Sequence, residues 1–137
     1  MKIIGIDSGI KELKKESPEI IKIDAQFEVV PTSLIVIAEA INSDTLFRVK
    51  FNNVEGFRVL NEADQLIFWD NDYLPNDWIW RIESGGWIDT EKKQNSTSML
   101  NIPSRDYVEY FITGITMCVN VACSDSEVPI IEQIDQN

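Results

Sequence analysis

The chain contains no histidine among its 137 residues. This absence excludes His-based general acid or base catalysis, Ser-His-Asp and Cys-His arrangements, and zinc sites built from cysteine and histidine. Any chemistry that remains must use carboxylates, lysines or a hard metal ion bound by carboxylates. We expect no cofactor and no metal.

Long hydrophobic segments are also missing. The first apolar run of any length, residues 32–41, has about ten residues, well below the roughly 20 that span a bilayer. Residues 1–9 include Asp7 and lack the continuous apolar core and small-residue cleavage site of a signal peptide. The sequence therefore predicts a cytoplasmic protein without a membrane segment.

Cysteine is scarce, with Cys118 and Cys123 the only two. Both lie in a predicted strand, where residues five apart are about 16 Å from each other and on opposite faces. A disulfide requires Cα atoms within about 7 Å. We predict two free, buried thiols, which agrees with a reducing compartment.

Positive charge is in short supply. Twelve basic and twenty-three acidic residues give a net charge of -11. Residues 1–60 hold eight basic and nine acidic residues (8 - 9 = -1), and residues 61–137 hold four and fourteen (4 - 14 = -10). Such a field repels nucleic acid and anionic lipid and attracts basic proteins. We expect a basic protein partner, neither nucleic acid nor a membrane, and no oligomeric state can be inferred.

Strand signals dominate the chain. The length and the 44% hydrophobic content predict one domain, residues 1–137. Alternation over residues 21–29 and 47–51 predicts half-buried strands, whereas the near-continuous run at 34–41 predicts a strand covered on both faces. Two further strands are expected at 107–114 and 117–123, and a short one after Pro129. The expected fold is α+β and β-dominated, with an antiparallel sheet that could be strongly curved or rolled and one or two short helices.

Two local predictions concern the middle of the chain. Asn61 is a suitable N-cap for a short helix that continues to Trp69. Residues 77–90 resemble a β-hairpin around a three-residue loop, Ser84-Gly85-Gly86. That register pairs Ile82 with Ile88, Arg81 with Asp89 and Trp80 with Thr90, which gives one apolar and one opposite-charge pair.

A cluster of acidic and aromatic residues is the predicted partner-binding site. Acidic side chains steer a basic partner toward the surface, and aromatic side chains buried on binding supply much of the affinity. The alternative is that the carboxylates solvate loops and the tryptophans belong to the core, since Trp78, Trp80 and Ile82 share a face of the expected hairpin. The predicted binding residues are Glu62, Asp64, Asp70, Asp72, Tyr73, Asp77 and Trp78.

An enzyme is the alternative from another class. Asp77, Asp89, Glu91 and Lys92 loosely match the acidic residues and lysine of metal-dependent nucleases, which hold Mg²⁺ and activate water. This spacing arises easily by chance in a chain with 26% charged residues. A nuclease would also have to overcome its own negative field. A third possibility is an acidic interaction module with an unrelated partner.

The last 80 residues resemble the immunity proteins of contact-dependent growth inhibition and related bacterial polymorphic toxin systems. The resemblance rests on the order of four segments: residues 56–64 followed by Trp69, residues 86–89, residues 110–114, and residues 118–121 leading to Pro129. It implies a cytoplasmic protein that binds the C-terminal domain of a cognate toxin and occludes its active site. A basic, nucleic-acid-cleaving toxin would suit the charge of this chain.

Overall fold

The fold consists of two antiparallel β-sheets and one helix in the part of the chain that the structure describes. The computed structural model describes residues 2–6, 18–27, 32–41, 44–61, 78–94, 107–124 and 128–134. These residues contain nine strands and the helix α2, Trp87–Gln94. The expected β-dominated fold with antiparallel pairing is confirmed, with the strands divided between two sheets.

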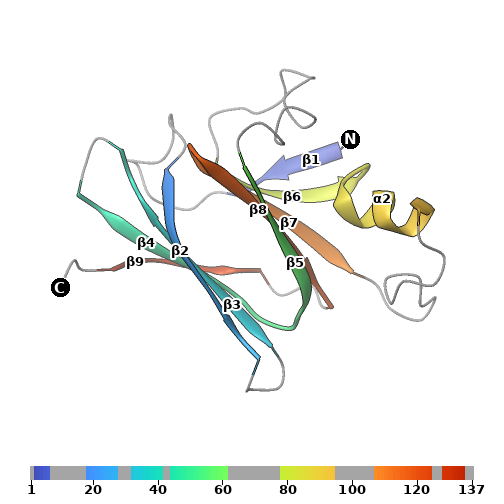
Figure 1. Cartoon of the computed structure of the whole chain (residues 1–137), viewed down its shortest axis with the longest axis horizontal. Coiled ribbons are helices and arrows are strands. Elements are labelled where there is room, and N and C mark those ends of the chain that lie inside the picture. The colour runs from blue at the N-terminus through green and yellow to red at the C-terminus, as the bar shows by residue number, and fades with distance from the viewer. Residues whose placement is uncertain are drawn as a thin grey trace.

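The larger sheet has five strands in the order β1-β6-β7-β8-β5. Every neighbouring pair is antiparallel. The strands are β1 (Lys2–Gly5), β5 (Val54–Asn61), β6 (Ile79–Ser84), β7 (Val108–Thr113) and β8 (Met117–Cys123). Helix α2 follows β6 and lies beside this sheet (Figure 1).

The smaller sheet has four strands in the order β2-β3-β4-β9, again antiparallel throughout. Its strands are β2 (Glu19–Gln26), β3 (Ser33–Glu39), β4 (Leu46–Phe51) and β9 (Ile130–Ile134). Because β9 pairs with β4, the end of the chain returns to the sheet formed by its first half. Figure 1 shows the two sheets as separate layers, with the four-stranded sheet on the left.

The main hydrophobic core lies between the two sheets. Alternate residues of each strand point toward it, as the two-residue period of a strand requires. Tilted ring pairs join the layers, with centroid distances of 6.5 Å for Phe47 and Trp78 and 5.5 Å for Phe51 and Tyr110. The buried residues of this core are Ile20, Leu34, Val36, Ala40, Phe47, Val49, Phe51, Val54, Trp78, Ile79, Tyr110, Ile112, Val119, Val121 and Cys123.

A second, smaller core lies on the other face of the five-stranded sheet. It contains Trp80, Ile82, Phe111 and Cys118, with Leu60 packed against them. Cys118 thus belongs to the smaller core and Cys123 to the main one, and both thiols are free and buried. The predicted placement of the two cysteines on opposite faces is confirmed.

Several strand predictions need correction in detail. A bulge between Ile20 and Lys22 places Ile20 in the core and leaves Ile21 half exposed, so the predicted alternation is displaced at its start. Phe27 is 68% exposed. Residues 34–40 alternate between buried and partly exposed, so β3 is covered on one face and not on both.

The third predicted strand, residues 47–51, is confirmed as β4, which ends at Phe51. Asn53 has a positive φ of 54° and turns the chain directly from β4 into β5, because asparagine tolerates the left-handed conformation. Gly56 therefore lies inside a strand. Asn61, the predicted helix cap, is the last residue of β5, and residues 62–69 of the predicted helix lie outside the described residues.

The predicted hairpin at 77–90 is wrong. Residues 79–84 form β6, but the chain then enters helix α2 and does not return as a strand. The partners of β6 are β1 and β7, so Trp80 pairs with Phe111 and Ile82 with Glu109. Within the described residues, no helix has the length and hydropathy needed to cross a membrane.

Candidate functional site

Helix α2 begins at a pair of glycines. Gly85 has a φ of 77°, which favours glycine, and the carbonyl of Gly86 accepts the first helical hydrogen bond from Thr90 N at 3.1 Å. A Cβ on Gly86 would lie 2.6 Å from Ile82 Cγ2 and 2.7 Å from Glu109 Oε2. Position 86 therefore requires glycine, and the residue at the start of the helix has no side chain with which to cap it.

Glu109, on strand β7, provides the missing cap. Its Oε1 accepts a hydrogen bond from Ile88 N at 2.8 Å, and its Oε2 accepts one from Trp87 N at 3.1 Å. These are two of the N–H groups that a helix leaves without intrahelical partners. Negative charge at this end also interacts favourably with the helix dipole. Glu109 thereby fixes α2 to the five-stranded sheet.

The contacts of Glu109 extend across the sheet to β5. Asn120 Nδ2 donates to Glu109 Oε2 at 3.1 Å, and Asn120 Oδ1 accepts from Arg58 Nε at 3.1 Å. The Arg58 guanidinium lies 5.4 Å from the centroid of the Trp87 ring, a cation–π distance. We call these four residues, Glu109, Asn120, Arg58 and Trp87, the Glu109 network.

Small side chains make room for the helix over the sheet. A Cβ on Gly56 would lie 3.6 Å from Trp87 Cη2, so the indole ring packs close to the backbone of β5. Ala122, the β8 residue paired with Gly56, is fully buried. Gly56 and Ala122 thus leave the space that the first turn of α2 occupies.

Burial sets the protonation of Glu109. The side chain is 3% exposed, and desolvation raises the pKa of its carboxyl above the ordinary value for glutamate. The hydrogen bonds from Ile88, Trp87 and Asn120 and the charge of Arg58 act in the opposite direction but are outweighed. Glu109 is therefore a buried acid that ionises less readily than a surface glutamate.

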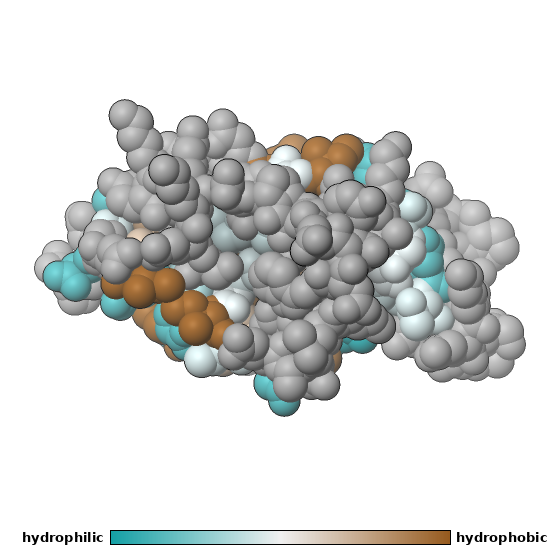
Figure 2. Space-filling model, turned by 90° about the horizontal axis from the view of Figure 1, so that it is seen from above, coloured by the Kyte–Doolittle hydropathy of each residue, from teal (hydrophilic) through white to brown (hydrophobic). Residues whose placement is uncertain are grey.

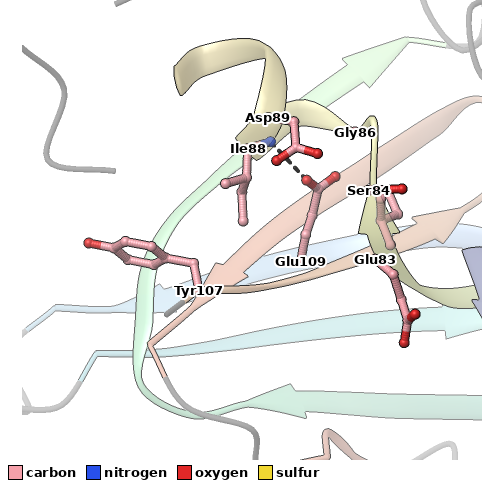
Figure 3. Close-up of a pocket in the computed structure, with 8 residues that line it drawn as sticks. Glu83, Ser84, Gly86, Ile88, Asp89, Tyr107 and Glu109 are labelled. Atoms are coloured by element: carbon pink, nitrogen blue, oxygen red, sulfur yellow. Dashed lines mark hydrogen bonds between the residues drawn. The ribbon is translucent and has the colours of Figure 1, made fainter. Parts of the chain in front are cut away.

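A pocket of about 200 Å³ lies next to this carboxyl group. Figure 3 shows Glu109 below the first turn of α2 with Asp89 nearby, whereas the carboxylate of Glu83 points away. Asp89 Oδ2 accepts a hydrogen bond from Gly85 N at 2.7 Å, which holds the loop at the rim of the pocket. The lining residues are Ile82, Glu83, Ser84, Gly86, Ile88, Asp89, Tyr107 and Glu109. We call this cavity the α2 pocket.

The α2 pocket suits a positively charged group. The carboxyl groups of Asp89 and Glu109 lie beside the cavity, and none of the lining residues is lysine or arginine. A carboxylate has about four acceptor positions, and Glu109 uses three for Trp87, Ile88 and Asn120. A donor that enters the pocket can therefore still bind it. The described residues contain no group of three or more cysteine, aspartate or glutamate side chains placed to hold a metal ion.

Most of the predicted partner-binding residues cannot be placed. Glu62, Asp64, Asp70, Asp72, Tyr73 and Asp77 lie outside the described residues. Trp78 is 2% exposed and packs against Phe47 in the main core, so its inclusion in a binding surface is wrong. Trp80 is buried as well, on the opposite face of the sheet, whereas Trp87 is partly exposed.

The residues of the enzyme alternative are only partly visible. Asp89 lies in the first turn of α2 and not on the expected hairpin strand. Asp77 and the side chains of Glu91 and Lys92 lie outside the described residues.

Sequence reasoning missed Glu109, Asn120 and Arg58. The available signal was a single carboxylate within the apolar strand segment Val108–Thr113, where burial without a partner would be costly. The start of a helix directly after a Gly-Gly pair could not be matched to this carboxylate, because the two segments are about 20 residues apart in sequence.

No protein-family model, curated protein or solved structure matches this chain.

Proposed function

We propose that this chain is a bacterial immunity protein that binds a basic toxin domain in the cytoplasm and occludes its active site. The observation that carries the proposal is the concentration of charge. Residues 61–137 account for -10 of the net charge of -11. A toxin that cleaves nucleic acid needs a basic groove, and an acidic protein can occupy that groove with fast, electrostatically steered association.

The α2 pocket supports the same proposal within the described residues. A lysine or arginine side chain of the partner can enter it, with its charged end near Asp89 and Glu109 and its aliphatic stem along Ile82 and Ile88. Charged groups that binding encloses contribute more to the binding free energy than exposed ones, because solvent and salt screen them less. The pocket would thus anchor a partner that the overall charge has attracted.

The segment 62–77 remains the proposed main contact surface. It carries Glu62, Asp64, Asp70, Asp72 and Asp77 together with Tyr73. With Trp78 in the core, Tyr73 is the aromatic residue of this set that we propose to contact the toxin.

Co-production with the neighbouring toxin tests the proposal. The C-terminal domain of the large protein encoded immediately upstream should stop growth when produced alone, and this chain should restore growth. Lack of such a toxin, or growth arrest despite the chain, would overturn the immunity function.

Matched charge reversals then test the surface. D70K/D72K should slow association with the toxin domain at least several-fold and flatten its salt dependence. D44K/E55K changes the net charge by the same amount at two exposed positions elsewhere and should have a smaller effect. Equal effects of both pairs would mean that segment 62–77 is not the contact surface.

A further inference from the structure

The outer face of the four-stranded sheet carries aliphatic side chains where a solvated face would be polar. The register places Ile35 and Ile37 on the face opposite to Val36, which is buried in the main core. The same face includes Leu46 and the half-exposed Ile130. Aliphatic side chains that gather on a solvent-facing side of a sheet can mark an interaction site.

Among the described residues, no helix lies over this face, unlike that of the other sheet. Helix α2 lies on the five-stranded sheet, where it contacts Glu109 and Gly56. On the side of the molecule that holds the four-stranded sheet, hydrophobic side chains reach the surface (brown, left of Figure 2). Ile130 is 48% exposed, and Ile35 and Ile37 are partly exposed.

The charges on this face almost balance, although those of the chain do not. Three basic and four acidic residues lie on it (3 - 4 = -1), whereas the whole chain has a net charge of -11. Two copies of so acidic a chain repel each other in most orientations, and the repulsion is least where nearly neutral surfaces meet. The residues counted are Lys22, Arg48, Lys50, Glu19, Asp24, Glu39 and Glu132.

The charges are also arranged so that the face complements itself. Lys22, Ile37, Arg48 and Glu132 form one row across the sheet, with Lys22 on edge strand β2 and Glu132 on edge strand β9. A twofold axis parallel to the strands, between β3 and β4, places β2 of one copy over β9 of the other. Lys22 then faces Glu132 of the second copy, twice per dimer, and Ile37 packs on the aliphatic stem of Arg48.

We propose that a second copy of this chain binds the outer face of the four-stranded sheet and forms a symmetric dimer. The sheets pack face to face, as in β-sandwiches, at about 10 Å. Helix α2 and the α2 pocket lie on the other sheet and stay accessible in the dimer. The dimer would thus present two acidic surfaces.

The size of the face sets the strength of the dimer. Four strands about 4.8 Å apart and about six residues long cover roughly 400 Å² per copy. This is about half of the roughly 800 Å² per partner in a standard interface. We therefore expect a weak dimer, with a dissociation constant between about 1 μM and 1 mM.

Sedimentation of the purified chain over a range of concentrations tests the proposal. We expect a monomer–dimer equilibrium that I130D weakens at least tenfold, because the new carboxylate faces Asp24 of the second copy. V59D is the matched control: Val59 is 45% exposed, on an edge strand of the other sheet, and its substitution changes the charge equally. A monomer up to about 1 mM, or equal weakening by both variants, would overturn the proposal.

A charge swap checks the orientation independently of any loss of fold in I130D. K22E and E132K should each weaken the dimer several-fold, E132K in part because it removes the ion pair of Glu132 with Arg48 of its own chain. The double variant K22E/E132K should bind several-fold more tightly than E132K alone. If the second substitution does not restore affinity in this way, the proposed orientation of the two copies is wrong. Salt should strengthen the dimer, because it screens the repulsion between two chains of charge -11. Salt should weaken toxin binding, because it screens the attraction between the acidic chain and a basic toxin. The opposite salt dependences separate this proposal from the proposed function.

Discussion

The outer faces of the two sheets differ, although both sheets contribute their inner faces to one core. On the five-stranded sheet, Trp80, Phe111 and Cys118 are at most 2% exposed, and helix α2 is fixed over Glu109. On the four-stranded sheet, Ile130 is 48% exposed, and the basic and acidic residues alternate with aliphatic ones. Strand alternation alone therefore does not determine which outer face is covered.

The difference originates in residue size and in one polar anchor. Gly56, Gly86 and Ala122 leave room for a helix above the five-stranded sheet, and the Glu109 carboxylate binds the N-terminus of that helix. The outer face of the four-stranded sheet has branched or long side chains at the corresponding positions, such as Ile35, Ile37 and Arg48. These side chains occupy the surface, so they leave no space for a helix, and none of them is placed to cap one.

Truncation of an aromatic residue on the covered face should have the largest effect. Trp80→Ala should lower the free energy of unfolding by about 3 kcal/mol, at the low end of the range for buried aromatics. We expect the low end because Trp80 Nε1 has no hydrogen-bond partner in the described part of the chain, so truncation also removes an unsatisfied donor. Ile130→Ala on the open face should cost less than about 1 kcal/mol. Denaturant unfolding of both variants compares the two faces directly, and similar losses would mean that both are covered.

Two glycines under the helix should respond differently to alanine. Gly86→Ala should destabilise the protein by about 1–3 kcal/mol, because its Cβ would overlap Ile82 and Glu109 and push α2 from its anchor. Gly56→Ala should change stability by less than about 1 kcal/mol, since its Cβ would make an ordinary 3.6 Å contact with Trp87. Thermal unfolding monitored by circular dichroism measures both. A tolerated Gly86→Ala would show that the contact between α2 and the sheet is not close.

Local patterns in the sequence predict much of the fold but not the division into two sheets. Alternation and β-branched runs located most strands, and the free cysteines on opposite faces followed from the strand period. Pairing of β9 with β4 or β5 with β8 depends on contacts between distant segments, which no local pattern records. The local pattern does not record the bulge at Ile21 either, where one extra residue moves the side chains that follow it to the opposite face of the strand.

Helix α2 shows why the candidate site was harder to predict. Ser84-Gly85-Gly86 is typical of a hairpin loop, and Ile82 with Ile88 gave a plausible cross-strand pair. The actual cap comes from Glu109, 23 residues beyond Gly86 in sequence. Asp89 in the first turn, followed by good helix formers at 91–94, was the local evidence for a helix. This local evidence is weak because Gly86, directly before the helix, has no side chain that could cap it.

Another prediction concerns the titration of Glu109 on the covered face. Burial raises the pKa of Glu109 in the folded protein, so the folded state holds this proton up to a higher pH than the unfolded state does. The stability that protonated Glu109 contributes is present below the unfolded-state pKa and is lost as the pH rises through the folded-state pKa. Relative to Glu109→Gln, which cannot ionise, the wild-type free energy of unfolding should therefore fall with rising pH. The fall should amount to about 1.4 kcal/mol for each unit of the shift. Urea unfolding of both proteins between pH 4 and 8 measures the difference, with Glu132→Gln on the open face as the exposed control. If the wild type instead gains stability with pH relative to Glu109→Gln, the hydrogen bonds to Trp87, Ile88 and Asn120 outweigh desolvation, and the charged carboxylate is the preferred cap of α2.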